Sequence, residues 1–303
     1  MTRTIVMVTV ALTSLVTGAL SAQRELVLLR SPASVRIAGM NGVGTAMMGD
    51  AGAVFTNPAG LATIRHVALE SSYRTTPLDG YMVLGALAWR LKQLNFGAGL
   101  QYFDRGVLLA NRLDSAVAAP ASSQKSYEWL AVGSLIYRYG LIAFGGSVKA
   151  ARQQAQGVRR RAIGVDAGIT LAVFDIMALG FAVQNIGGNL RTDSDLVLPK
   201  LSRFGFTMNY VDPQETLRLL SSIEVQWPEG HESRVVLGIE GGVVISGVGV
   251  KGRLGWGGGE FGDRSNFTFG ASLDIGRTNI DFSSERESLL GETAQRIGVR
   301  IRL

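Results

Sequence analysis

The chain has 303 residues and a formal net charge of +6; hydrophobic residues make up 47% of it and charged residues only 18%, with a mean hydropathy of +0.21. The absence of cysteine excludes a disulfide framework, a thiolate metal site and a cysteine nucleophile. An apolar composition with 39 glycines gives little support to long helices and favours many short strands. The positive charge suits nucleic acid or anionic lipid as a partner, so the positions of the basic residues must decide between them.

Residues 1–22 have the pattern of a cleaved secretory signal peptide. Arg3 precedes an apolar run from Ile5 to Leu20, and small residues follow up to Ala22. The mature chain would then begin near Gln23, whereas an uncleaved membrane helix is the alternative interpretation of the same run. After this segment no stretch has the roughly 18 uninterrupted apolar residues that a spanning helix needs, so any further crossing must use strands.

Residues 23–66 lack a strand pattern and are rich in glycine and other small residues. Such a segment buries too little surface to fold by itself. The interior of a barrel would supply the missing contacts. We therefore predict a small N-terminal hatch, or plug segment, over residues 23–66.

From residue 67 onward apolar side chains recur at every second position, which places them on one face of a strand. At the C-terminus, for example, Ile297, Val299 and Ile301 alternate with Gly298 and Arg300. We predict an all-β fold, an antiparallel transmembrane β-barrel of about 14 strands over residues 67–303. The predicted strands are 67–76, 80–91, 93–103, 127–138, 141–150, 161–173, 176–186, 201–211, 217–227, 234–243, 247–256, 266–275, 278–284 and 293–303.

The connections between these segments alternate between tight turns and longer loops, such as residues 104–126 and 151–160. This alternation is typical of outer-membrane barrels, and an even strand number returns both termini to the periplasm. Aromatic residues on the apolar faces form two bands, as expected for membrane interfaces, although a soluble barrel is the alternative. The expected location is the bacterial outer membrane. The two bands are Trp89, Tyr137 and Tyr210 near the tight turns, and Tyr102, Trp129, Trp227 and Trp256 near the loops.

Features of an enzyme are missing from the sequence. The only two histidines, His66 and His231, lie far apart, so we expect no metal site. The glycines Gly42, Gly44 and Gly49 have no following Gly-Lys-Ser/Thr, and no Gly-x-Ser-x-Gly occurs. The basic residues are spread over many strands, which argues against nucleic acid as a partner. We expect a protein without enzymatic activity and without a cofactor.

Charged residues of both signs project into the predicted lumen. Paired carboxylates could perform acid-base chemistry, but a mixture of signs around an enclosed space favours ion pairs that hold the plug. These residues are Asp166, Glu224, Glu240, Asp274 and Asp281 with Arg90, Lys149, Arg203, Lys251, Arg253, Arg296 and Arg300.

Arginines also gather in the predicted loop 151–160 and just after it. Arg152, Arg159 and Arg160, followed by Arg161, would lie on the extracellular side, where guanidinium groups match the phosphates of lipopolysaccharide. The alternative is ordinary solvated loop charge. Outer-membrane lipid and lipopolysaccharide are therefore expected partners.

The segment from residue 39 to residue 61 resembles the N-terminal signature of the PorV/PorQ family of outer-membrane barrels, which are related to FadL-type channels. Further segments similar to the family are 184–188, 203–205, 237–240 and 251–256, so the resemblance covers nearly the whole mature chain. Asn41 interrupts the glycine-rich run, and the loops are short for a carrier of protein cargo. The hatch motif consists of Gly39, Met40, Gly42, Gly44, Asp50, Asn57, Pro58, Ala59 and Gly60.

The resemblance implies a 14-stranded barrel with an N-terminal hatch, and two functional hypotheses. The first is a barrel that binds or escorts exported proteins at the type IX secretion system; it predicts an exposed apolar patch at Val107, Leu108 and Leu109. The second is a FadL-like channel for fatty acids or other hydrophobic compounds, which predicts an apolar pocket beside Met40. The candidate ligand-pocket residues are Met47, Met48 and Phe55.

Overall fold

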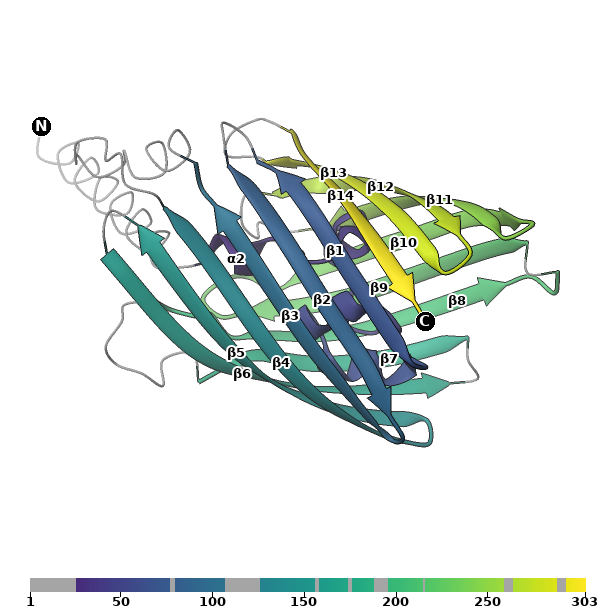
Figure 1. Ribbon diagram of the computed structural model, residues 1–303, viewed down its shortest axis with the longest axis horizontal. Helices are drawn as coiled ribbons and strands as arrows, with labels where there is room; N and C mark the ends of the chain where they lie inside the picture. The colour runs from purple at the N-terminus through teal and green to yellow at the C-terminus, as the bar shows by residue number, and fades with distance from the viewer. Residues whose placement is uncertain are drawn as a thin grey trace, which may run out of the picture.

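The computed structural model describes residues 26–76, 80–106, 126–155, 158–173, 176–187, 196–214, 216–258, 264–287 and 293–303. Fourteen antiparallel strands form a closed barrel in which each strand pairs with its chain neighbours and β1 pairs with β14 (Figure 1). The strands are β1 Val67–Thr75, β2 Tyr81–Leu91, β3 Leu94–Asp104, β4 Tyr127–Tyr139, β5 Ile142–Ala155, β6 Val158–Val173, β7 Met177–Ile186, β8 Leu201–Val211, β9 Leu217–Pro228, β10 Arg234–Ile245, β11 Val248–Gly257, β12 Arg264–Ile275, β13 Thr278–Glu287 and β14 Thr293–Arg302.

The barrel closes where its first and last strands meet. The amide of Leu303 donates a hydrogen bond to the carbonyl of Val67 at 2.8 Å, and the β1–β14 register runs from Ala68 opposite Arg302 to Arg74 opposite Arg296. Both ends of the barrel chain therefore lie at the end with the tight turns, which we call the short-turn end. The opposite end is the long-loop end.

Each strand presents an apolar outer face and a small or polar inner face. On β1, Leu69 and Tyr73 point outward and are 39% and 45% exposed, whereas Glu70 and Arg74 point inward and are buried. The same alternation exposes large hydrophobic side chains on the outside of every strand. This inside-out arrangement is the one that suits a barrel surrounded by lipid.

All fourteen predicted strands are present, and most of their ends agree with the prediction to within two residues. The main error is the predicted loop 151–160, most of which continues β5 and β6 up to the pair Ala155 and Val158. The apolar alternation fades there because the outward positions Arg152 and Gln154 are polar and the inward positions include Gln153 and Arg160, yet the backbone pairing continues. β7 also contains a register shift at Asn185, which has a φ of +61°.

The N-terminal segment lies inside the barrel (Figure 1, purple). It consists of the short helices α2 Val27–Arg30 and α3 Val35–Ala38 and the 3-10 helices η1 Ala51–Phe55 and η2 Pro58–Thr63. Among the described residues, none of the helices is long and apolar enough to span a membrane. The predicted signal peptide, residues 1–22, lies outside the described residues. The fold is thus a 14-stranded barrel with a small hatch in its lumen.

Candidate functional site

Inward-facing glycines of the wall allow the hatch to approach the strands closely. A Cβ atom at Gly145 on β5 would lie 2.5 Å from the backbone nitrogen of Ala59, and one at Gly255 on β11 would overlap the backbone of Met40 and Asn41. Since a side chain at these positions would displace the hatch, the wall needs glycine there. Wall glycines at which an added Cβ atom would meet the hatch are Gly97, Gly99, Gly145, Gly168, Gly180, Gly205, Gly238, Gly255, Gly257, Gly270 and Gly298.

The hatch is also fixed by buried ion pairs. Arg36 donates to Asp50 at 2.7 Å and, through two nitrogens, to both carboxylate oxygens of Glu240 on β10 at 2.7 and 2.9 Å. Asp50 in turn accepts from Arg300 at 2.7 Å and from Arg302 at 2.8 Å, both on β14. A bidentate guanidinium-carboxylate pair sets both position and orientation. Arg36 and Asp50 therefore join the hatch to two separate strands of the wall, β10 and β14.

The charge of Asp50 is stabilised by its surroundings. Burial alone would raise the pKa of this carboxyl group, but the positive charges of Arg300, Arg302 and Arg36 hold its pKa well below its ordinary value of 3.8. Asp50 is therefore ionised at neutral pH. A predicted hatch-motif residue thus has a direct electrostatic contact with the last strand.

Main-chain groups of the hatch are matched by polar side chains of the wall. Glu224 on β9 accepts hydrogen bonds from the amides of Gly44 and Thr45, each at 2.9 Å. Arg203 on β8 donates to Glu224 at 2.7 Å and to the carbonyl of Gly42 at 2.5 Å. Because unsatisfied buried peptide groups are costly, these contacts fix the irregular backbone of the hatch.

The two asparagines of the hatch act as anchors. Asn57 caps η2 by accepting from the amide of Ala59 at 3.0 Å and donates to Thr170 on β6 at 3.1 Å. Asn41 has a φ of +54° and donates through its side chain to the carbonyl of Asn266 at 2.8 Å. Its side-chain oxygen accepts from Arg234 at 2.9 Å. Asn41, which departs from the family's glycine run, is thus a further attachment to the wall.

The predicted lumenal charges form ion pairs. Lys149 pairs with Asp166 at 2.8 Å, Arg253 pairs with Glu240 at 2.5 Å and with Asp281 at 2.8 Å, and Lys251 pairs with Asp274. The exception among the predicted residues is Arg90, which lies exposed at the short-turn end and donates to the carbonyl of Lys92. Charge pairing, rather than free paired carboxylates, is therefore the main feature of the lumen.

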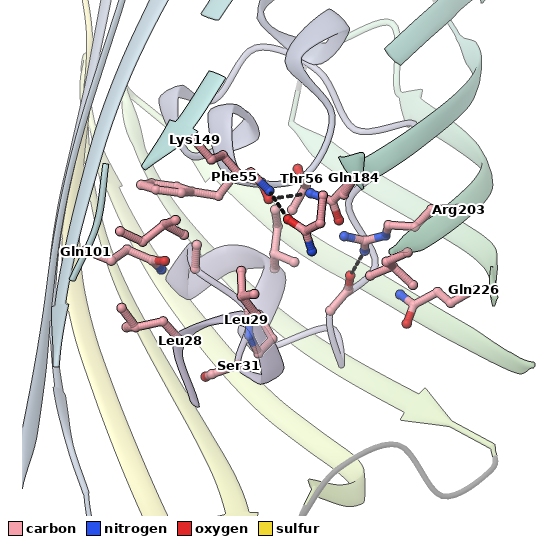
Figure 2. A pocket seen from close by; sticks show the side chains of 17 residues that line it. Leu28, Leu29, Ser31, Phe55, Thr56, Gln101, Lys149, Gln184, Arg203 and Gln226 are labelled. Atoms are coloured by element: carbon pink, nitrogen blue, oxygen red, sulfur yellow. Dashed lines mark hydrogen bonds between the residues drawn. The ribbon is translucent and has the colours of Figure 1, made fainter. Parts of the chain in front are cut away.

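A cavity of about 60 Å³ lies inside the barrel, between two parts of the hatch and the wall (Figure 2). We call residues 26–33 the α2 segment and residues 34–61 the hatch core. Leu28 and Leu29 of the α2 segment line one side of the cavity, and Phe55 and Thr56 of the hatch core line another. The wall contributes the apolar Leu130 and Leu201 and the polar residues Gln101, Lys149, Gln184, Asn185, Arg203 and Gln226.

The predicted pocket residues are dispersed. Phe55 lines the cavity, and its carbonyl accepts from Gln184 at 2.8 Å. Met47 packs in a separate buried cluster with Met40, Val43, Leu220 and Val236, and Met48, which is half-buried, is not in the cavity lining. The prediction of a methionine-lined pocket therefore differs from the observed cavity, because Met40 and Met47 pack against Leu220 on β9 and Val236 on β10.

The α2 segment is the apolar part of the site. Leu26 and Leu28 are almost fully buried in the same hydrophobic cluster as Phe103 on β3, Leu130 on β4 and Leu198, which follows β7. Sequence reasoning did not identify these leucines. The signal was the short apolar run that follows the predicted cleavage site.

Glu128, also missed, holds this end of the hatch. It is fully buried at the long-loop end of β4, where it accepts from the amide of Leu28 at 3.2 Å, from Gln153 at 3.0 Å and from Arg105. An acidic residue at an inward position, next to the apolar inward residues Leu130 and Val132, was the signal for such a role. Arg36, similarly, was a lone charge among small residues.

The arginines predicted to contact lipopolysaccharide lie on strands, not in a loop. Arg152 and Arg159 face outward at the long-loop end of β5 and β6, together with Arg161. Arg160 instead faces inward, where it donates to Gln153 at 3.3 Å. Arg160 thus lacks the outward orientation that the prediction assumed, because the paired strand extends past it and alternation turns it toward the lumen.

Other expectations fall partly outside the described part of the chain. The apolar patch expected at residues 107–109 lies outside the described residues. Within the described ranges, no group of three or more His, Cys, Asp or Glu side chains is arranged to hold a metal ion.

The comparisons with known proteins bear on the fold. No family model matches the chain, and no curated protein matches it. It is similar to the toluene transporter TbuX of Ralstonia pickettii, with a TM-score of 0.56 and 14% identity over 90% of this chain and 98% of that one. It is also similar to the Pseudomonas putida toluene transporter TodX, with a TM-score of 0.57 and 12% identity over 90% and 97%. A Pseudomonas aeruginosa FadL homologue gives 0.57 and 12% over 89% and 98%. The chain therefore has the fold of the FadL-type outer-membrane barrels.

Proposed function

We propose that this protein is an outer-membrane channel for a small hydrophobic molecule, closed at rest by its hatch. The observation that carries the proposal is the position of the α2 segment. Its leucines Leu26 and Leu28 fill an apolar site between the hatch core and the wall, next to the cavity. An apolar ligand would compete with these side chains for the same surroundings.

The outer face of the barrel supports a location in the outer membrane. Large hydrophobic side chains such as Phe144, Phe269 and Ile297 are more than half exposed there. Exposing them to water over the whole circumference would be costly, whereas lipid accommodates them. The signal-peptide pattern of residues 1–22 agrees with export, and cleavage near Ala22 would begin the mature chain a few residues before α2.

In the described part of the chain, the cavity beside the α2 segment has no room for a hydrocarbon. The cavity of about 60 Å³ is far smaller than the roughly 150 Å³ that holds benzene in a protein core or the 300 Å³ or more of ligand pockets. Its wall side is also polar, so water suits it better than a hydrocarbon does. Entry of a hydrophobic molecule at this cavity therefore requires movement of the α2 segment.

Such movement needs few bonds to break. Among the described residues, the α2 segment is attached by the Leu28 amide to Glu128 and by Arg296, which donates to the carbonyls of Pro32 and Ala33 and to the hydroxyl of Ser31. Its burial is otherwise apolar, and an entering apolar ligand would replace those contacts. Toluene transport by TbuX and TodX, and the monoaromatic hydrocarbon channel CymD, indicate a compound of this size as the first to test.

The test is direct binding and uptake of toluene and of a fluorescent fatty acid. We expect Leu28→Ala to bind the probe more tightly than the native protein, since truncation vacates part of the site. The control is Leu87→Ala, which removes an outward leucine of β2. Absence of binding to both proteins, together with uptake no faster than in cells lacking the protein, would refute the proposal.

The secretion-partner hypothesis remains a prediction from the PorV/PorQ resemblance. Its distinguishing surface, residues 107–109, lies outside the described residues, so the described part of the chain offers no observation in its favour. Mass spectrometry of proteins that co-purify from the native membrane tests it. A secreted protein in stoichiometric amount would favour it over the channel.

A further inference from the structure

The outer surface of the β5–β6 hairpin has three arginines at the long-loop end. We call Arg152, Arg159 and Arg161 the arginine patch. In the strand register, Arg152 lies between Trp129 on β4 and Arg161 on β6, all on the outward face. Arg159 lies one step farther out and donates to Gln154 at 3.3 Å. Three guanidinium groups and an indole thus meet on one exposed surface.

The register places like charges opposite one another. Arg152 and Arg161 are direct partners across β5 and β6. Side chains in this relation have Cβ atoms about 4.5–5.5 Å apart, and like charges there destabilise the pair. The two guanidinium groups therefore concentrate positive charge on this part of the outer surface, which is the kind of surface that a multivalent anion binds.

The height of the patch matches the headgroup level of a membrane. From Ile142 at the short-turn end of β5 to Arg152, the outward side chains are uncharged, and several are large and apolar. Ten residues span roughly 33 Å of strand, or about 25 Å along the barrel axis at a tilt near 40°. That is the height of the apolar band of an outer-membrane barrel, so Arg152 lies at its upper edge.

A row of aromatic rings leads to the patch around the same rim. Tyr73, Tyr81, Tyr102 and Tyr127, from four successive strands, have neighbouring ring centroids 6.0, 6.2 and 6.0 Å apart. Tyr102 is in turn the register partner of Trp129. Amphipathic rings at this level contact sugars and the upper parts of acyl chains.

We propose that the arginine patch and Trp129 form a binding site for lipopolysaccharide, with the guanidinium groups on its phosphates and the aromatic row along its sugars and acyl chains. The proposal rests on the outer-membrane location proposed above. Arginine suits this ligand because its planar fork binds phosphate oxygens in pairs. In this proposal Arg161, which faces outward, contacts lipopolysaccharide, whereas the sequence analysis had predicted Arg160 for that contact.

The test measures lipopolysaccharide retained per barrel after gentle detergent extraction, by native mass spectrometry. We expect the native protein to retain it and the double variant Arg152→Gln, Arg161→Gln to lose about tenfold or more, a factor typical of hydrogen bonds to charged groups. The matched control is Arg286→Gln, an exposed arginine near the long-loop end of β13. Equal retention by native protein and double variant would overturn the proposal.

Titration of the stripped barrel identifies the source of the phosphate. Labelled lipopolysaccharide should bind to the stripped barrel. Unlabelled lipopolysaccharide should displace it, whereas phosphatidylglycerol micelles and inorganic phosphate should not. Binding of phosphatidylglycerol with equal affinity would refute the assignment. Heat-dependent gel mobility and probe uptake report separately on the barrel and on the channel, so the double variant should preserve both. A native protein absent from the outer membrane would instead contradict the proposed function.

Discussion

The hatch core and the α2 segment share one lumen but are held in different ways. The core is attached by buried ion pairs around Asp50, by wall carboxylates such as Glu224, and by glycines that admit its backbone. The α2 segment is held mainly by apolar burial, with Glu128 and Arg296 as its polar attachments. Directional contacts fix one position, whereas apolar contacts are readily exchanged for those of a ligand. The difference indicates a fixed plug with a replaceable end.

The largest effect is expected from Asp50→Ala. The substitution leaves Arg36 and Arg300 buried without their shared partner, which costs on the order of 3–5 kcal/mol. The hatch core should then loosen while the barrel stays closed, so ion conductance in planar bilayers should rise. Glu232→Ala, at an exposed turn position, serves as the control. Unchanged conductance in Asp50→Ala would show that the ion pairs do not hold the core.

A smaller effect is expected from two glycines of the same strand. In Gly255→Ala the new methyl group would overlap the backbone of Met40 and Asn41, whereas at Gly252 a methyl group meets nothing within 4 Å. We expect Gly255→Ala to destabilise the seated hatch by about 1–3 kcal/mol and Gly252→Ala to have little effect. Protease sensitivity of the hatch in the intact barrel measures this. Equal protection of the two variants would contradict close packing at Gly255.

A disulfide bond between the hatch core and the wall tests whether ligand binding needs the core to move or only the α2 segment. A Cβ atom at Gly205 on β8 would lie 3.5 Å from that of Ala46, within the range that a disulfide spans. In the cysteine-free chain, Ala46→Cys with Gly205→Cys should therefore form a bond between core and wall. We expect probe binding to be the same before and after reduction, because the core does not need to move. Binding that appears only after reduction would show that the whole hatch moves.

The smallest effect is expected from mild acid. Because the pKa of Asp50 is lowered in the folded protein, its contribution to stability is complete above its ordinary value of 3.8 and is lost as the pH falls toward the lower, folded value. Hatch retention, measured as low conductance, should be the same at pH 7 and at about pH 5. A rise in conductance already between these values would require another titrating group.

Much of the barrel is predictable from the sequence because one physical rule repeats along it. Residues that face outward are apolar and those that face the lumen are small or polar, so segments such as Phe204 to Tyr210 indicate their own strand and face. The rule failed in the β5–β6 hairpin, where Arg152 and Gln154 occupy outward positions beyond the apolar band. There the backbone pairing, not the side chains, determines the strand.

The site is less predictable because its contacts join residues far apart in the chain. The pairing of Glu224 with the amide of Gly44 spans 180 positions, and neither residue signals the other. The pattern did indicate that lumenal charges pair and that the glycine-rich segment needs a close-packed surrounding. The position of the cavity, and the role of Leu28 rather than Met47 beside it, depend on side-chain packing that a linear pattern does not contain.

The ion pairs of Asp50 have a consequence for assembly of the barrel. They join the N-terminal hatch to Arg300 and Arg302, 250 and 252 positions later, on the strand that closes the barrel against β1. Contacts of such high sequence separation form late in folding, since the chain entropy of the intervening loop opposes them. We therefore expect the pairing of β1 with β14 and the docking of the hatch to occur together, as the last step of folding. A barrel that has finished folding is already plugged, so at the proposed location in the outer membrane it would not open a leaking pore.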